Sequence, residues 1–212
     1  MIQIDDAGSG SLIGGTCIGA IRVETSEFYH EFVPIDCYVG YDFQSKQYLK
    51  KTDEIVFKLL EKLRANKDET IEICQGYMFD NTRSILEKEG YQVSSTKIGE
   101  PLQDIIENTF QNYALSLGVP AQYVKYTKYP LHFHRILRWV YADYENRASL
   151  CKTGWKSWKR YGCLTPDICY GILNMDNYIC LKCGKDIIKG SRVKILKYFS
   201  NCKNIIYLHT RC

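Results

Sequence analysis

Two adjacent carboxylates near the start of the chain, Asp5 and Asp6, could hold a metal ion. They follow a short apolar segment that begins at Ile2, and a glycine-rich stretch comes directly after them. Carboxylate oxygens are the ligands that hard divalent cations such as Mg²⁺ and Mn²⁺ prefer. The same residue types also favour a tight turn, in which Asp side chains accept hydrogen bonds from nearby backbone N–H groups. The pair therefore indicates either a metal site or the start of a turn.

Further acids stand where two helices are expected to begin. Asp80 precedes one amphipathic segment, and Glu100, Asp104 and Glu107 share a face of the next because they are spaced at i, i+4 and i+7. Asp80 could instead cap its helix, and the other three could form a solvated acidic face. Two-metal phosphodiester hydrolysis needs several carboxylates that hold cations about 4 Å apart. We expect these ligands to be Asp5, Asp6, Asp80 and Asp104, with Glu107 as the next choice.

A second group of chemically active residues lies near the end of the sequence. Cys180 and Cys183 form a Cys-x-x-Cys-Gly motif, which presents two thiolates to one cation. His209 and Cys212 are three residues apart, a spacing that lets them meet on one helical turn. Four such ligands fill a tetrahedral Zn²⁺ shell, so the site would be structural. The alternative is chance spacing in a chain with ten cysteines.

The segments between these two ligand pairs predict a hairpin, with strands over residues 192–199 and 204–208. The whole arrangement resembles treble-clef or LIM-like zinc modules, which occur in many proteins that bind nucleic acid or other proteins. The four remaining cysteines of this half are expected to be small buried apolar residues. They are Cys151, Cys163, Cys169 and Cys202.

Periodicity places the acids on a mixed α/β framework in the first 118 residues. Apolar residues alternate in segments that predict strands, and they recur every three or four positions in segments that predict helices. Three strands with short links predict an antiparallel meander, and the later strands alternate with helices, which predicts right-handed crossovers. In chain order we expect strands over residues 1–5, 16–23 and 27–38, a helix over 50–64, a strand over 70–74, a helix over 80–89, a strand over 91–98 and a helix over 100–117.

This β-β-β-α-β-α-β-α order resembles the ribonuclease H-like fold of ribonucleases H, Holliday-junction resolvases and integrases. The stretch Asp-Asp-Ala-Gly-Ser-Gly-Ser-Leu-Ile-Gly, which begins at Asp5, resembles the Asp-Glu-Ala-Gly-Arg-Gly-Pro-Leu-x-Gly motif of type 2 ribonucleases H at six of nine defined positions. In that family the two leading acids bind metal, which implies the same role for Asp5 and Asp6. The family's arginine, which helps to recognise a ribonucleotide, is Ser9 here, and its proline is Ser11. The resemblance thus implies metal chemistry but does not extend to ribonucleotide recognition.

The charge of the chain changes sign along its length. Residues 1–118 contain 11 Lys and Arg against 19 Asp and Glu, whereas residues 119–212 contain 17 against 5. Cations interleaved with aromatic residues are typical of surfaces that contact phosphates and stack on bases. The alternatives are a solvated basic face and tryptophans that pack in the core. After a Tyr- and Lys-rich connection over residues 124–130, we expect nucleic-acid contacts from Arg135 and Arg138 on a helix over 131–147, and from Lys152, Lys156, Lys159 and Arg160.

Length and composition limit the remaining classes. The 212 residues and 45% hydrophobic content allow a packed core, and no apolar run reaches membrane-spanning length. Without an export signal, ten cysteines indicate reduced thiols, and we expect a soluble, cytoplasmic protein. The expected domains are a ribonuclease H-like catalytic domain over residues 1–120, a basic helical extension over 121–175 and a zinc-binding module over 176–212.

These features predict a metal-dependent nuclease that hydrolyses a structured nucleic acid, either an RNA/DNA hybrid or branched DNA, by a two-metal mechanism. Mg²⁺ or Mn²⁺ would be catalytic and Zn²⁺ structural. The alternative is a non-catalytic module on the same fold that binds nucleic acid or protein. A further alternative is a regulator whose basic part docks on its own acidic part. The first two hypotheses differ in whether the acids converge to within metal-bridging distance.

Overall fold

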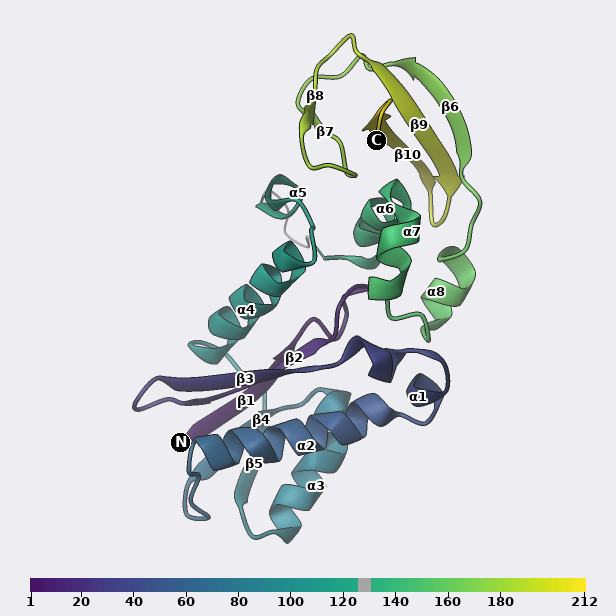
Figure 1. Cartoon of the computed structure of the whole chain (residues 1–212). Coiled ribbons are helices and arrows are strands. Elements are labelled where there is room, and N and C mark those ends of the chain that lie inside the picture. Colours follow the sequence, from purple (N-terminus) through teal and green to yellow (C-terminus); the bar gives the residue numbers. More distant parts are fainter. Residues whose placement is uncertain (126–130) are drawn as a thin grey trace. The chain divides into compact units, whose positions relative to one another are not determined.

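The computed structural model describes residues 1–125 and 131–212, so the connection expected over 124–130 lies mostly outside the described residues (Figure 1). Their contacts divide the chain into two compact units. The N-terminal unit comprises Met1–Ser9 and Gly14–Tyr113, and the C-terminal unit comprises Gly10–Ile13 and Ala114–Cys212. The segments expected as a helical extension and a separate zinc module therefore belong to one unit.

A five-stranded mixed sheet forms the centre of the N-terminal unit, which is of the mixed α/β class. The strand order is β3-β2-β1-β4-β5. The first three strands are antiparallel neighbours, and β4 and β5 continue the sheet in parallel with β1, as the meander and crossovers of the sequence predict. The strands are β1 (Ile2–Ala7), β2 (Thr16–Arg22), β3 (Glu27–Val33), β4 (Thr70–Cys74) and β5 (Gln92–Thr96).

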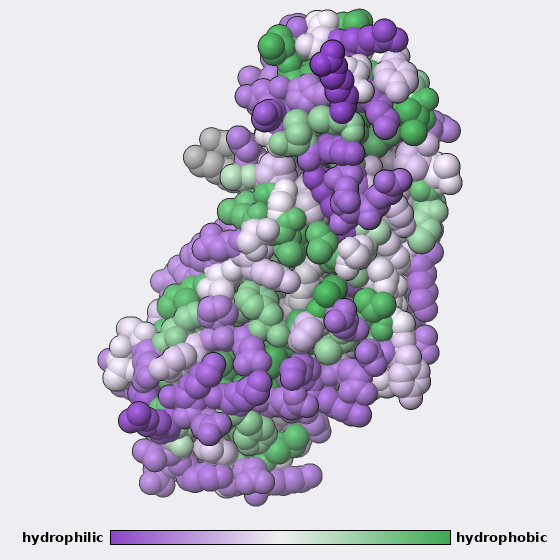
Figure 2. Space-filling model, viewed as in Figure 1, coloured by the Kyte–Doolittle hydropathy of each residue, from purple (hydrophilic) through white to green (hydrophobic). Residues whose placement is uncertain are grey.

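Three principal helices cover this sheet, α2 and α3 on one face and α4 on the other (Figure 1). They are α2 (Gln47–Lys62), α3 (Asp80–Lys88) and α4 (Leu102–Ser116), and the shorter helices are α1 (Gly40–Gln44), η1 (Ile35–Tyr38) and η2 (Tyr77–Phe79). The apolar stripe of α2 places Val56 and Leu59 in the same buried core as Ile2 and Ile4 of β1. The surface over α2 and α3 is mainly hydrophilic (Figure 2).

The C-terminal unit combines short helices with two small sheets. Its three-stranded antiparallel sheet has the order β10-β9-β6, and a two-stranded sheet pairs β7 with β8. The strands are β6 (Asp167–Ile172), β7 (Tyr178–Ile179), β8 (Asp186–Ile187), β9 (Arg192–Phe199) and β10 (Lys203–His209). The β9–β10 pair confirms the predicted hairpin. The helices are α5 (Ala121–Lys125), α6 (Phe133–Ala142), α7 (Tyr144–Arg147), η3 (Ala148–Leu150) and α8 (Lys156–Tyr161).

The prediction of a single helix over residues 131–147 is wrong, because the helix is interrupted at Asp143. Asp143 has φ −154° and ψ 64°, which is not helical, and it separates α6 from α7. Its carboxylate accepts hydrogen bonds from Asn146 Nδ2, 3.1 Å away, and lies 3.2 Å from Lys182 Nζ. These contacts favour the start of a second helix at this position, since Asp is a common residue at helix N-termini. None of the helices in the described ranges has the length and apolar content of a membrane span.

Candidate functional site

Cys180, Cys183, His209 and Cys212 converge in the C-terminal unit and form what we call the Cys3His cluster. Their ligand atoms all lie within 4.8 Å of one another. The Sγ atoms of Cys183 and Cys212 are 3.3 and 3.9 Å from Nδ1 of His209. Three thiolates and one imidazole at these separations match a tetrahedral Zn²⁺ shell. The four residues that the sequence spacing selects thus come together in space.

The imidazole of His209 is oriented by a second contact. Its Nε2 lies 3.2 Å from the backbone oxygen of Asp186, which leaves Nδ1 as the nitrogen that faces the three thiols. An N–H donor on one ring nitrogen and a metal on the other is the common arrangement of histidine ligands. A zinc ion bound here would cross-link the Cys-x-x-Cys turn, the end of β10 and Cys212.

The thiols of the cluster affect one another's ionisation. Burial raises the pKa of Cys183, but the Lys185 N–H and hydrogen bonds with Cys180, His209 and Cys212 outweigh it, and the pKa falls to about 7. Burial and the neighbouring thiols raise the pKa of Cys212 to about 12. Because thiols must lose their protons to bind a metal, the Zn²⁺ affinity of this cluster should depend on pH.

The backbone around the Cys-x-x-Cys motif is held by a residue that sequence reasoning missed. Arg147 is 8% exposed and donates hydrogen bonds to the carbonyl oxygens of Leu181 and Lys182, the two residues between the cysteines, at 2.8 and 2.9 Å. It also donates to Trp139 O at 2.6 Å and lies 4.0 Å over the Trp139 ring. No local pattern marks this role, because its partners lie 8 to 35 positions away.

Glycine is required at the end of this turn. Gly184 has φ +74°, in the left-handed region, and its N–H donates to Cys180 O at 2.8 Å.

The predicted helical arrangement of the other two ligands is wrong. His209 and Cys212 do not share a helical turn, because β10 ends at His209 and a tight turn follows, with the Cys212 N–H donating to His209 O at 3.0 Å.

Asp5 and Asp6 are adjacent residues within β1. The strand does not end at Asp5 but continues to Ala7, with Asp5 opposite Gly19 and Asp6 opposite Ile18. Neighbouring residues of a strand face opposite sides of the sheet. The turn that would let both carboxylates reach one cation is therefore absent at this position.

Asp5 faces α4. A side chain at Gly19, its partner on β2, would meet Ile106 of α4 within 2.9 Å, which shows how closely the helix covers this face. Asp5 is 9% exposed, and its burial raises the pKa of its carboxyl, opposed by hydrogen bonds from Cys74 and the Asp6 N–H, while the Glu107 charge raises it further. Of the helix acids, Glu107 is the one whose charge acts on Asp5.

Asp6 lies toward the opposite face, among tyrosines. Its charge contributes to the raised pKa values of Tyr38 and Tyr77, for which burial is the larger cause. It also borders the end of β4, since a side chain at Gly76 would lie 3.7 Å from Asp6 Oδ1. Burial likewise raises the pKa of Cys74, the last residue of β4, to about 11.

Asp80 and Asp104 are both exposed. Asp80 is the first residue of α3 rather than its N-cap, which is Phe79, so the capping alternative is wrong. Its side chain is 68% exposed and forms an ion pair with Arg83. Asp104 and Glu107 are exposed on α4, and Gln103 Nε2 donates to Glu107 at 3.3 Å.

Across residues 1–125 and 131–212, the Cys3His cluster is the one group of three or more His, Cys, Asp or Glu side chains arranged to hold an ion. The five predicted acids Asp5, Asp6, Asp80, Asp104 and Glu107 do not gather in such a group. Two-cation hydrolysis needs several convergent carboxylates, so the metal-binding role of these five acids stays a prediction.

Three of the six predicted nucleic-acid contacts are engaged inside the protein. Lys152 is fully buried, with Nζ 5.2 Å from the Trp155 ring. Arg135 donates to Tyr123 O from Nε at 3.2 Å, and Arg138 donates to Ile205 O at 2.9 Å. The expectation that these side chains face out toward phosphates is wrong for Lys152, and the two arginines are half-buried with internal partners.

The other three cations, Lys156, Lys159 and Arg160, are exposed along α8. Trp158 of the same helix is 6% exposed and stacks on Tyr144 with ring centroids 6.4 Å apart, so this tryptophan packs in the core as the alternative reading has it. Among the remaining cysteines, Cys151 is buried, but Cys163 and Cys202 are exposed, contrary to expectation.

A scan against protein-family models and a search of curated proteins find no match to the chain.

Proposed function

We propose that the chain is a nucleic-acid-binding protein whose C-terminal unit is stabilised by a structural Zn²⁺ ion. The observation that carries the proposal is the Cys3His cluster, with all ligand atoms within 4.8 Å, inside a half of the chain that has 17 Lys and Arg against 5 Asp and Glu. A closed four-ligand site has no open position for catalysis, and an excess of positive charge favours a polyanionic partner. Ten free cysteines favour a reducing compartment such as the cytoplasm.

The exposed cations of α8 support phosphate contact. Lys156, Lys159 and Arg160 stand at i, i+3 and i+4, so they lie on one side of the helix, and their charges are not used by an ion pair in the described residues. Contacts of this kind position a protein on nucleic acid without reading its sequence.

The test uses the full, zinc-loaded chain and fluorescein-labelled duplex DNA, RNA/DNA hybrid and single strands, with anisotropy measured over a salt series. We expect binding that weakens steeply with salt, with a slope of about 0.7–0.9 per phosphate contacted. Replacement of Lys156, Lys159 and Arg160 by Gln should reduce that slope. A variant with Gln at Lys62, Lys88 and Lys97, exposed cations of the N-terminal unit, is the matched control. Absence of binding to every probe at low salt would overturn the proposal.

A second candidate function is the metal-dependent nuclease. It is supported by the action of the Glu107 charge on Asp5 and by the strand and helix order of the N-terminal unit, which agrees with that of the ribonuclease H-like fold it resembles. Because the predicted acids do not gather into an ion-holding group among the described residues, we assign no catalytic step to Mg²⁺ or Mn²⁺. The test is incubation with labelled hybrid, branched and single-stranded substrates and Mn²⁺, with Asp5→Asn as comparison. Equal cleavage by both proteins, or none by either, would exclude this candidate.

A further inference from the structure

The outer strand of the three-stranded sheet carries a row of exposed apolar side chains. Ile168, Tyr170 and Ile172 of β6 are 58%, 57% and 54% exposed, and they share one face because alternate residues of a strand point to the same side. Hydrophobic residues are visible at the surface along the side of the C-terminal unit where β6 runs (Figure 2). Contiguous exposed apolar residues commonly mark a binding surface.

Two cations lie on the same face of the sheet, on the neighbouring strand β9. Arg192 is in register with Ile172, and Lys194 is in register with Tyr170. The Arg192 guanidinium lies 5.8 Å from the centre of the Tyr170 ring. We call Ile168, Tyr170, Ile172, Arg192 and Lys194 the β6–β9 face. Its combination of an open aromatic ring with flanking cations suits a ligand that has both planar rings and negative charge.

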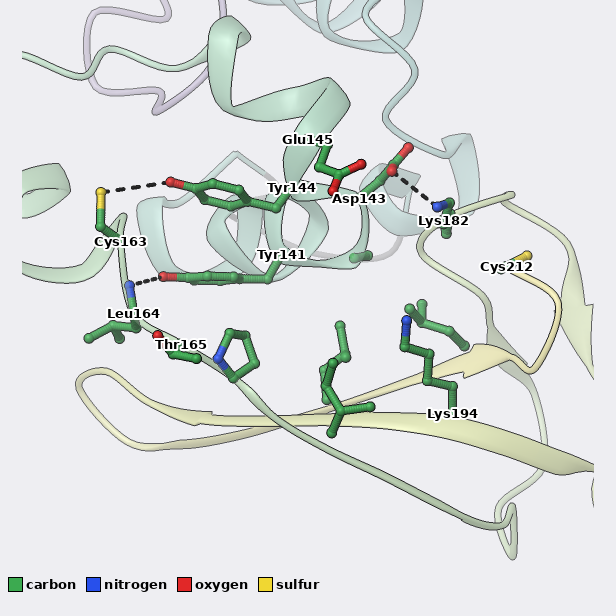
Figure 3. Close-up of a pocket in the computed structure, with 15 residues that line it drawn as sticks. Tyr141, Asp143, Tyr144, Glu145, Cys163, Leu164, Thr165, Lys182, Lys194 and Cys212 are labelled. Atoms are coloured by element: carbon green, nitrogen blue, oxygen red, sulfur yellow. Dashed lines mark hydrogen bonds and ion pairs between the residues drawn. The ribbon is translucent and has the colours of Figure 1, made fainter.

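The β6–β9 face continues into a cleft of about 550 Å³. Ile168 and Lys194 line the cleft together with the aromatic residues Tyr141 and Tyr144, whose rings stack 5.7 Å apart (Figure 3). Lys194 rises from the strand toward the cleft, opposite the helices that carry the two tyrosines. The volume is in the range of small-molecule sites and can admit a single base with its sugar.

The charged groups of the cleft distinguish between ligands. Asp143 is paired with Lys182 at 3.2 Å, and Glu145 is exposed at the rim. Carboxylates repel the close phosphate rows of a duplex, but they accept hydrogen bonds from N–H groups on the Watson–Crick edge of an unpaired base, such as N3–H of thymine. A base can also stack on Tyr170 only after it has left a paired helix.

We propose that the β6–β9 face and its cleft bind single-stranded nucleic acid. A base stacks on Tyr170 between Ile168 and Ile172, and Arg192 and Lys194 contact the adjacent phosphates. A neighbouring base enters the cleft beside Tyr141. The inference rests on the proposed nucleic-acid function and names both the substrate class and the surface.

The experiment measures the affinity of the full, zinc-loaded chain for fluorescein-labelled oligo(dT) of 15 nucleotides and for a 15-bp duplex. Tyr170→Ala should weaken oligo(dT) binding about tenfold, since loss of one base–aromatic stack costs about 1–3 kcal/mol. Tyr170→Phe should keep the wild-type affinity, because the ring remains. Tyr41→Ala, which removes a tyrosine 77% exposed in the N-terminal unit, is the matched control. Duplex affinity should be the same for all four proteins.

The cations provide a second measurement. Arg192→Gln and Lys194→Gln should each lower the slope of log affinity against log salt for oligo(dT) by roughly 0.7. If the chain binds oligo(dT) and Tyr170→Ala binds it as tightly as wild type, the inference is overturned while the proposed function stands. If a short peptide probe, rather than oligo(dT), binds in a Tyr170-dependent way, a protein partner replaces nucleic acid on this face. If no nucleic acid binds at all, the proposed function fails as well.

Discussion

The two units of the chain reach stability by different means. In the N-terminal unit, apolar side chains from a five-stranded sheet and α2 form a continuous core, and ion pairs such as Arg22 with Glu69 lie at its margin. In the C-terminal unit, helices of three to ten residues and small sheets are joined by the Cys3His cluster and by arginines that bind backbone carbonyls. Short helices gain little from their own hydrogen bonds, so tertiary links must hold them.

This contrast indicates where each unit is vulnerable. Burial of apolar surface is insensitive to chelators, whereas a metal-dependent fold loses its binding free energy when the ion is removed. The N-terminal unit also contains a buried acid, Asp5, whose ionisation opposes the stability of that unit. In the described residues, no cysteine of the N-terminal unit belongs to a metal-binding cluster. Four perturbations separate the two regimes, beginning with the largest expected effect.

Removal of the metal should unfold the C-terminal unit and leave the N-terminal unit folded. Structural Zn²⁺ sites contribute on the order of 10 kcal/mol to folding. Hydrogen exchange measured peptide by peptide should show loss of protection in residues 131–212 after chelation, with residues 14–113 unchanged. Cys183→Ser should reproduce this result, and Cys163→Ser, which changes an exposed cysteine outside the cluster, should not. Equal protection of both units after chelation would contradict the view that only the C-terminal unit depends on a metal ion for its stability.

Arg147→Leu should destabilise the C-terminal unit by about 3 kcal/mol, because three carbonyl oxygens lose their donor in a buried place. The zinc affinity should fall about 10- to 100-fold, since Arg147 orients the turn that carries Cys180 and Cys183. Competition with a chromophoric chelator measures the affinity, and denaturant unfolding measures the stability. Arg160→Leu, at an exposed position, is the control. An unchanged zinc affinity would show that the turn is organised without Arg147.

Glu69→Gln should destabilise the N-terminal unit by about 1 kcal/mol at neutral pH. The hydrogen bonds from Arg22 and the Asn66 N–H lower the pKa of Glu69 to about 2. Its contribution is therefore present above the unfolded value of about 4.5 and is lost as the pH falls toward 2. Thermal unfolding of wild type and variant between pH 7 and 2.5 should converge at the acidic end. Parallel curves over the whole range would contradict this assignment.

Asp5→Asn should stabilise the N-terminal unit by about 0.5 kcal/mol at pH 7, because acids held in a folded site often reduce stability. Burial and the Glu107 charge raise the pKa of Asp5, so its protonated form favours the fold. That contribution is complete below the unfolded pKa and disappears as the pH rises through the raised folded pKa. Asp104→Asn, at an exposed position on α4, should have no effect. A lower melting temperature for Asp5→Asn would contradict the prediction.

Sequence predicted the features that depend on local pattern. The alternation and helical periodicity of residues 1–118 give the strand and helix order, and the Cys-x-x-Cys spacing gives the ligand set of the Cys3His cluster. The features it missed depend on distant partners. Asp5 and Asp6 face opposite sides because β2 continues to pair with β1 as far as Ala7, and this register is not visible in the motif itself.

In the C-terminal unit, too, sequence patterns do not predict contacts between residues that are distant in the chain. Lys152 stands in a sequence run rich in cations and looks solvent-exposed, yet its N–H donates to Leu12 O at 2.8 Å and its side chain is buried. Asp143, which separates α6 from α7, is paired with Lys182, far along the chain. Sequence patterns report which residues share a helix or strand, but not which backbone groups a buried cation will meet.

The segment Gly10–Ile13 belongs by its contacts to the C-terminal unit, although the chain on both sides of it belongs to the N-terminal unit. Leu12 and Ile13 find their partners at Lys152 and Cys151. During synthesis on a ribosome, the partners of this segment are made about 140 residues after it. At ordinary elongation rates this delay is roughly 7–30 s. A fragment that starts after Tyr113 would lack the segment Gly10–Ile13, which is part of the C-terminal unit. Truncation at this point therefore does not yield a complete C-terminal unit.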